Sequence, residues 1–286
     1  MPITIAEYLG VNAAAGAPVP HPAGIAAPNC PFNGLACTKI SKNKKPVCSV
    51  WAGSDLWITC QHRLLSDSKD AAITHPYMSI KASEIATRLW QFPFSMSQVA
   101  VARKKNIQAS QADFVFALNP GWRVVNAPLR FVLEIQGGGD TTDSYQQAVA
   151  EWENGSRPLT DVIPKCSPND RNVWKRLMEQ LLTKGLAATK ARQGIGCVIS
   201  DRLFNAVDDW IRWRALTLPE DGYADFIVIP FTVRDSSTSP IALVPHDEHI
   251  IRTSFTAFFD HLRRSSQAAD FTGAYIQLDG NATDGL

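Results

Sequence analysis

The chain has 286 residues, of which 45% are hydrophobic and eight are tryptophan. This length allows one large domain or a larger domain with a smaller attachment, and the composition excludes global disorder. A formal net charge of +1 neither requires nor excludes a nucleic-acid partner. The sequence shows no apolar run long enough to span a bilayer and no secretion signal at Met1, so we expect a soluble cytoplasmic protein with no membrane partner.

The beginning of the chain has few signs of regular structure. Residues 11–29 are rich in Ala, Pro and Gly without periodicity, and residues 30–60 contain no clear helical or strand pattern. We therefore expect an irregular N-terminal segment over residues 1–70 and a larger domain over residues 71–286.

The larger domain is predicted to alternate between strands and helices. Its first part predicts a helix over 79–90, strands over 98–102, 113–118 and 129–135 with a reversal at 119–121, and a helix over 141–153. Its second part predicts a strand over 160–163, a helix over 170–190, a strand over 195–200, a helix over 202–214, a strand over 224–230 and a helix over 253–264. This order predicts an α/β (α+β) fold in which helices flank a mixed central sheet.

Two acidic residues lie in otherwise apolar, β-prone runs. Asp113 opens one run, and Glu134 closes another together with Ile135 and Gln136. Strand alternation puts Glu134 and Gln136 on one face and turns Ile135 toward the core. The two carboxylates and the main-chain carbonyl of Ile135 offer oxygen ligands for a hard divalent cation, and such a cation can act on a phosphodiester.

Other interpretations of these acids stay open. Acids at this spacing are common, so both can simply flank exposed strands, although burying an unpaired carboxylate is costly. The residues around Asp225 repeat the pattern around Asp113, but no strand-embedded acid follows them. His246 and His249, further on, are spaced for a metal on one helical turn, yet a helix cap with solvated histidines is the favoured interpretation.

A known nuclease family shares this order of elements. A helix with Glu84, a strand with Asp113, a strand ending in Glu134-x-Gln136 and a following helix resemble the PD-(D/E)xK nuclease core in its variant with glutamine at the last position. The resemblance implies an αβββαβ catalytic domain within residues 71–286, with Mg²⁺ on Asp113, Glu134 and the Ile135 carbonyl, and assistance from Glu84. The chain departs from the motif in two ways: Ala112 stands where proline is common, and the last position lacks lysine.

Four of the six cysteines lie in the N-terminal segment, at Cys30, Cys37, Cys48 and Cys60. In a reducing compartment such a group favours metal ligation over disulfides, although no Cys-x-x-Cys pair is present. Zinc and iron both suit four thiolates, and His62 can replace one of them. The alternative is a set of unrelated buried cysteines, which is what we expect of Cys166 and Cys197 in later elements.

The combination of both features has a closer parallel. Four cysteines that begin with Cys30-Pro31-Phe32-Asn33-Gly34, ahead of a nuclease core ending in Glu-Ile-Gln, are similar over residues 30–153 to the NotI-type restriction endonucleases, including EagI-like members. The resemblance implies that the cysteines hold a single structural iron near the DNA. It also implies a type II site-specific deoxyribonuclease, a homodimer that uses Mg²⁺ to hydrolyse both strands of a short palindromic GC-rich site, with CGGCCG as a candidate core.

Two basic runs are candidate contacts to double-stranded DNA: Lys39, Lys42, Lys44 and Lys45, and then Arg103, Lys104 and Lys105. Guanine readout and phosphate contact both suit them, and the alternative is a pair of solvated loops. Two further functions remain possible. One is a repair-type or non-specific nuclease with the same core, and the other is a non-catalytic DNA-binding regulator folded around a metal–cysteine site.

Overall fold

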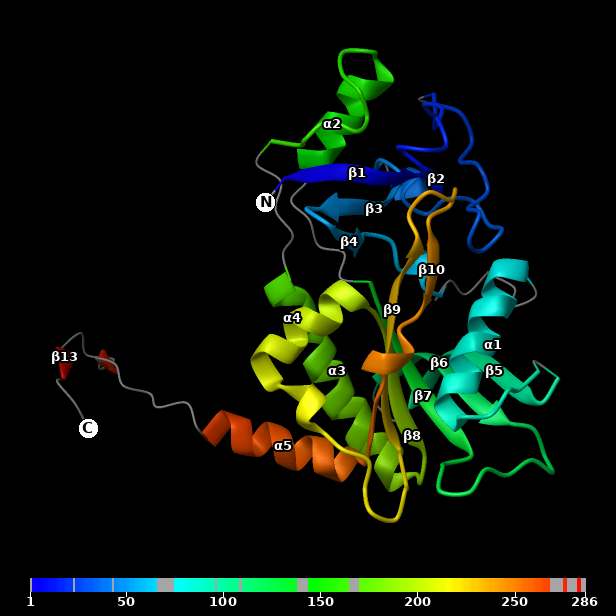
Figure 1. Ribbon diagram of the computed structural model, residues 1–286, viewed down its shortest axis with the longest axis vertical. Coiled ribbons are helices and arrows are strands. Elements are labelled where there is room, and N and C mark those ends of the chain that lie inside the picture. The colour runs from blue at the N-terminus through cyan, green and yellow to red at the C-terminus, as the bar shows by residue number, and fades with distance from the viewer. Residues whose placement is uncertain are drawn as a thin grey trace.

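The structure is a computed structural model that describes residues 2–22, 24–42, 44–65, 75–95, 97–107, 110–137, 144–164, 170–267, 275–276 and 282–283. The described chain is a mixed α/β structure with five α-helices and a mixed sheet, consistent with the α+β class. Figure 1 shows a small N-terminal sheet at one end of the molecule and the larger sheet with its helices at the other.

The small sheet corrects the expectation of an irregular N-terminal segment. Its strands are β1 (Ile3–Tyr8), β2 (Val11–Asn12), β3 (Val47–Ala52) and β4 (Asp55–Ile58), in the antiparallel order β2-β1-β3-β4. The sequence pattern did not predict β3 and β4, because nearly all their residues are buried. Neither strand therefore shows the alternation of polar and apolar residues that marks a strand with one solvent-facing side. Gly53, with φ of +61°, makes the turn between them.

One helix from later in the chain completes the core of the small sheet. Residues Tyr145, Ala148 and Val149 of α2 (Ser144–Glu153) pack against the apolar residues of β1, β3 and β4. The strand predicted over 160–163 does not form. Instead, Leu159 and Ile163 join this same apolar cluster, and the Ile163 amide donates to the carbonyl of Ile3 at 2.7 Å.

The large sheet is mixed, as the sequence predicted. Its main strands run in the order β10-β9-β8-β7-β6-β5, and β11 also pairs with β9. Pairing is antiparallel among β5, β6 and β7, parallel from β7 through β8 to β9, and antiparallel where β10 and β11 join β9. The bounds are β5 Val99–Ile107, β6 Ser110–Leu118, β7 Arg130–Gln136, β8 Gly194–Ser200, β9 Phe226–Asp235, β10 Ala242–Pro245 and β11 Ile251–Thr253.

Helices cover both faces of this sheet. One face packs against α1 (Pro76–Trp90), and the other against α3 (Asp170–Lys190), α4 (Asp201–Ile211) and α5 (Phe255–Gln267). α3 and α5 touch closely, since a Cβ atom at Gly185 would lie 2.0 Å from the Phe255 ring. All four helices lie where their sequence patterns predicted them, within a few residues at each end.

Strand alternation assigns each side chain of β7 to one face. Phe131, Leu133 and Ile135 belong to the apolar cluster under α1, whereas Val132 belongs to the cluster under α3. Glu134 and Gln136 follow the parity of Val132 and therefore lie on the α3 side. Near the C-terminus, β12 (Tyr275–Ile276) and β13 (Ala282–Thr283) form a separate hairpin.

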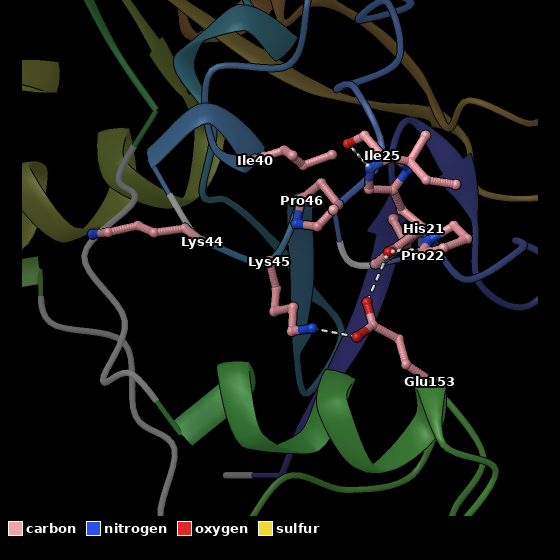
Figure 2. Close-up of a pocket in the computed structure, with 10 residues that line it drawn as sticks. His21, Pro22, Ile25, Ile40, Lys44, Lys45, Pro46 and Glu153 are labelled. Atoms are coloured by element: carbon pink, nitrogen blue, oxygen red, sulfur yellow. Dashed lines mark hydrogen bonds and ion pairs between the residues drawn. The ribbon is translucent and has the colours of Figure 1, made fainter.

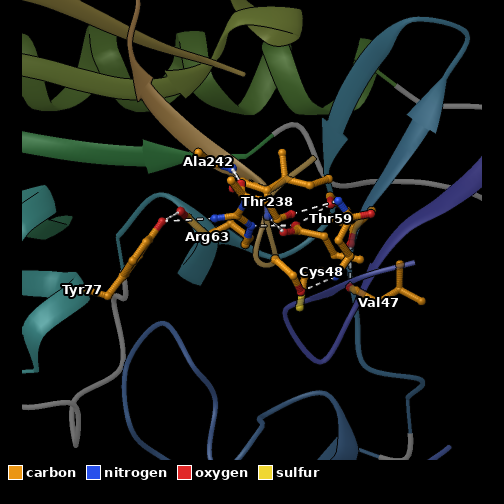
Figure 3. A network of polar contacts seen from close by, with 12 residues as sticks. Val47, Cys48, Thr59, Arg63, Tyr77, Thr238 and Ala242 are labelled. Carbon is orange, nitrogen blue, oxygen red and sulfur yellow. Dashed lines mark hydrogen bonds and ion pairs between the residues drawn. The ribbon is translucent and has the colours of Figure 1, made fainter. Parts of the chain in front are cut away.

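A buried ion pair and its hydrogen bonds connect the small sheet with Ile241, the residue before β10 of the large sheet. Glu7 and Arg63 are 0% and 1% exposed, and Arg63 Nε donates to Glu7 Oε2 at 2.7 Å. The same carboxylate accepts from Ser49 Oγ at 2.6 Å and from the Ile241 amide at 2.9 Å, while Arg63 Nη2 donates to the Ile241 carbonyl at 2.6 Å. Figure 3 shows Arg63 between Tyr77 and the other residues of the network, and Arg63 Nη1 donates to the Tyr77 hydroxyl at 3.3 Å. Such full hydrogen bonding is what a buried charge pair requires.

Within the described residues, no helix combines the length and the apolar character needed to cross a bilayer.

Candidate functional site

The structure brings Asp113 and Glu134 together. β6 and β7 pair with Phe114 opposite Leu133, and one further step in this antiparallel register sets Asp113 opposite Glu134. Asp113 is half-buried and Glu134 is 1% exposed. Asp113 Oδ2 accepts a hydrogen bond of 3.0 Å from the Ile135 amide, which fixes its carboxylate over the end of β7.

The electrostatics of Glu134 are unusual. Burial, together with the negative charge of Asp113, raises the pKa of Glu134 from an ordinary 4.5 to about 7. Lys184 acts in the opposite direction, since its Nζ lies 2.6 Å from Glu134 Oε2 and both side chains are nearly inaccessible. Two acids and one lysine therefore meet between β6, β7 and α3, where Glu134 and Lys184 are buried and Asp113 is half-buried.

Sequence reasoning missed Lys184, although α3 itself was predicted. Leu177, Leu181, Lys184 and Ala188 follow the helical spacing that marks one face, and all four are buried. A lysine at a position that the pattern assigns to the core is the signal that was available. Lysine is rarely buried without a partner, so its position indicated an acid on the facing sheet.

The other proposed catalytic residues divide between the two faces. Gln136 lies one strand repeat beyond Glu134, paired with Ile199 of β8, and the Ile135 side chain is buried in the core as expected. Glu84 is not brought to the acid pair: it lies on α1, which covers the opposite face, and it binds Lys81 at 3.0 Å. The periodicity of α1 could not show which face of the sheet the helix would cover.

Asp225, whose surroundings resemble those of Asp113, has a structural role. Its Oδ1 accepts from the Phe255 amide at 2.6 Å, at the first turn of α5. An acid that binds a free amide at a helix start stabilises that helix. This contact explains a buried acid next to the apolar strand β9 without any catalytic function.

His246 and His249 are partly exposed and His246 precedes a 3₁₀ helix, as the interpretation as cap residues implied, but the His246 side chain makes no cap hydrogen bond. Both imidazole Nδ1 atoms converge on Asp201 Oδ1, at 2.9 Å for His246 and 3.1 Å for His249. The sequence did not reveal this cluster because Asp201 lies far away in the chain, at the start of α4.

The four N-terminal cysteines gather in one region of the structure. Cys30 and Cys37 flank a tight loop in which the Cys30 amide donates to the Leu35 carbonyl and Gly34 adopts φ of +74°. Cys48 lies on β3, and its carbonyl accepts from the amides of Thr59 and Cys60 just beyond β4. None of the four is in a disulfide. Cys166 lies outside the described residues, and Cys197 is fully buried beside Glu134, as a core residue would be.

Burial and neighbouring cysteines disfavour ionisation of three of these thiols. Burial, and then the neighbouring Cys60 and Cys37, raise the pKa of Cys30 to about 11. The pKa values of Cys48 and Cys60 are raised in the same way, by burial first and by other cysteines of the group. Cys30, Cys48 and Cys60 are therefore harder to ionise than exposed thiols. The sulfur atoms of the four cysteines lie further apart than the ligand atoms of Asp201 and its two histidines.

The basic residues of this segment have different environments. Lys39 points inward, donating to Thr59 Oγ1 at 3.1 Å and to the Val47 carbonyl, and burial lowers its pKa. Lys45 forms an ion pair with Glu153 at the edge of a cavity of about 280 Å³ (Figure 2). Lys42 and Lys44 are exposed and accessible to a ligand. Arg103, Lys104 and Lys105 lie on the edge strand β5, and their side chains are outside the described part of the chain.

Comparison of the sequence with models of known protein families and with curated proteins found no match.

Proposed function

We propose that this chain is a Mg²⁺-dependent DNA endonuclease with a PD-(D/E)xK core, and that it acts as a type II restriction enzyme. The observation that carries the proposal is the acid pair: Asp113 and Glu134 oppose each other on adjacent strands, and Lys184 approaches from α3. The order α1-β5-β6-β7, then helices, then β8 parallel to β7 supports it, because it follows the αβββαβ order of that core.

A divalent cation fits the acid pair. Asp113 and Glu134 offer carboxylate oxygens, the ligands that Mg²⁺ prefers, and the Ile135 carbonyl is the third proposed ligand. Glu134 ionises with difficulty beside Asp113, so a cation between them would relieve the repulsion between their charges. When bound, Mg²⁺ supplies the charge relief and water activation that phosphodiester hydrolysis needs.

Lys184 supplies the positive charge that Gln136 lacks. In the structure this ammonium neutralises Glu134, and a divalent cation on the same carboxylate would take over that role. The ammonium would then be available to bind a scissile phosphate in a site with little competing water. Gln136, on the same face, is assigned to orient water or a phosphate oxygen through its amide.

The remaining parts of the proposal concern the assembly. We assign a single iron, with zinc as the alternative, to Cys30, Cys37, Cys48 and Cys60, where it holds the loop of Cys30 against β3. A homodimer would provide one active site for each strand of a two-fold symmetric, GC-rich DNA sequence. Lys42 and Lys44 are the exposed basic residues that we assign to its phosphates.

Plasmid cleavage tests this function. The purified chain is incubated with supercoiled GC-rich plasmid and Mg²⁺, and the products are separated by electrophoresis and sequenced at their ends. Discrete bands support a restriction enzyme, whereas a smear supports a non-specific or repair-type nuclease. Absence of cleavage with Mg²⁺ or Mn²⁺ on any GC-rich substrate would reject the enzyme and favour a DNA-binding regulator.

Matched variants connect cleavage to the site. Asp113→Asn removes one carboxylate charge with little change of shape and should lower the cleavage rate by roughly 100-fold or more. Glu179→Gln removes one charge from an exposed position of α3 and should leave cleavage unchanged. Equal activity of the two variants would reject the acid pair as the active site.

A further inference from the structure

A second group of ligand-type side chains lies outside the proposed active site. Asp201, His246 and His249 present ligand atoms that all lie within 4.8 Å of one another, and this is the one such group of three or more found among the described residues. Asp201 begins α4, while His246 precedes the short 3₁₀ helix Asp247–His249 and His249 is its last residue. The group therefore joins two elements that are distant in the chain.

The distances suit a small metal ion. In a tetrahedral zinc site with bonds of about 2.0–2.1 Å, neighbouring ligand atoms are roughly 3.3 Å apart. The observed separations from Asp201 Oδ1 are 2.9 Å to His246 Nδ1 and 3.1 Å to His249 Nδ1. A cation bound among these three atoms would therefore require only a small outward movement of the three side chains.

The surrounding structure holds the ligands in place. Phe204, three residues after Asp201 on α4, stacks on His249 with an interplanar angle of 6°. The His246 amide donates to the Pro230 carbonyl at 2.8 Å, which attaches this end of the turn to β9. From the other side, Arg88 of α1 binds both carboxylate oxygens of Asp247 at 2.9 and 3.0 Å. Such supporting contacts are what orient ligands in metal sites.

The group is also accessible. The three side chains keep 23–30% of their surface exposed, so an ion can enter and can retain water or an external ligand. Here the donors are two imidazoles and one carboxylate, which suit Zn²⁺ and its neighbours Co²⁺ and Ni²⁺, whereas the Asp113–Glu134 pair offers only oxygen. The two sites would thus select different ions.

We propose that Asp201, His246 and His249 form a binding site for a divalent transition metal of the zinc class, separate from the acid pair and from the four cysteines. Three protein ligands leave at least one coordination position open to solvent. The bound ion would fasten the turn at Asp247–His249 to the start of α4. Asp201, the first residue of α4, follows β8 directly and lies two residues after Ile199, which pairs with Gln136.

Cobalt titration tests the site in the full-length chain. The protein is dialysed against a chelator and titrated with Co²⁺ while its visible and near-ultraviolet absorption is recorded. Cobalt on the cysteines gives a thiolate charge-transfer band, which cobalt on nitrogen and oxygen ligands does not give. The wild-type chain should bind Co²⁺ at an additional site without that band.

Three variants decide the outcome. His249→Ala and Asp201→Asn should each weaken the additional site by roughly tenfold or more and leave the thiolate band unchanged. His21→Ala, at a histidine outside the group, should have no effect. Asp201→Asn keeps an oxygen for the imidazole N–H groups, so it preserves a cluster that is only hydrogen-bonded. Cobalt binding by Asp201→Asn equal to that of the wild type would overturn the proposal, whether or not His249→Ala folds.

Discussion

Replacing Glu134 by glutamine should make the protein more stable at high pH while it removes cleavage. Ionised Glu134 is unfavourable in the folded chain because of burial and the charge of Asp113, which raise its pKa from 4.5 to about 7. Each pKa unit corresponds to about 1.4 kcal/mol, so ionisation costs the folded state about 3 kcal/mol relative to the protonated acid. The uncharged amide of the variant would resemble the protonated acid at every pH.

The direction of the pH dependence follows from the raised pKa. Below pH 4.5 the acid is protonated in both the folded and the unfolded chain, and it imposes no penalty. As pH rises from 4.5 to about 7, the unfolded chain loses this proton first, so the stability contributed by the group falls. The wild type and Glu134→Gln should therefore be equally stable near pH 4. The variant should be more stable at pH 8, by up to about 3 kcal/mol.

Urea unfolding at pH 4, 6 and 8 measures this difference. The gain should shrink when Mg²⁺ is added at pH 8, because the cation stabilises ionised Glu134 in the folded wild type but has no acid to bind in the variant. The opposing effect is the ion pair with Lys184, which the variant loses. If Glu134→Gln is less stable than the wild type at pH 8 without Mg²⁺, that ion pair outweighs burial and repulsion, and the reasoning fails.

Three other substitutions test separate parts of the account. Lys184→Met should lower the cleavage rate by about 100-fold or more and shift the pH–rate profile to higher pH, because Glu134 loses the neighbouring ammonium group. The control is Lys190→Met at an exposed position, and equal pH–rate profiles for the two variants would contradict this role of Lys184. Cys48→Ser should lose bound iron or zinc in metal analysis of the intact protein, and unchanged metal content would reject the cysteine site. Arg63→Met should reduce the free energy of unfolding by about 3–5 kcal/mol in urea, because it leaves Glu7 buried and unpaired; a loss below about 1 kcal/mol would show that Glu7 finds another partner.

Much of the large sheet and its helices could be predicted from local pattern. Helical periodicity predicted α3 at its observed bounds, and the apolar runs predicted β6, β7 and β8. The small sheet could not be found in this way, because β3 and β4 are buried on both sides and lack alternation. A short strand such as β11 has too few residues to carry any periodic signal.

The site was predictable only where its residues share a strand pair. Asp113 and Glu134 meet because their strands are neighbours along the chain, so a hairpin brings them together. Lys184 reaches the site through the packing of α3 on the sheet, which no spacing in the sequence encodes. For the same reason, the sequence could not show that α1 covers the opposite face of the sheet and keeps Glu84 away from the acids. It also could not show that Asp201 contacts His246.

Cleavage by the acid-pair variants tests the central claim most directly. Rates are measured with Mg²⁺ on one plasmid substrate for the wild type, Asp113→Asn, Glu134→Gln and the double variant. If both carboxylates hold one cation, each single variant should lose roughly 100-fold or more, and the double variant should lose little more than either, because groups that act as a unit are not additive. A single variant that cleaves at the wild-type rate, or losses that simply multiply in the double variant, would contradict a shared cation on Asp113 and Glu134.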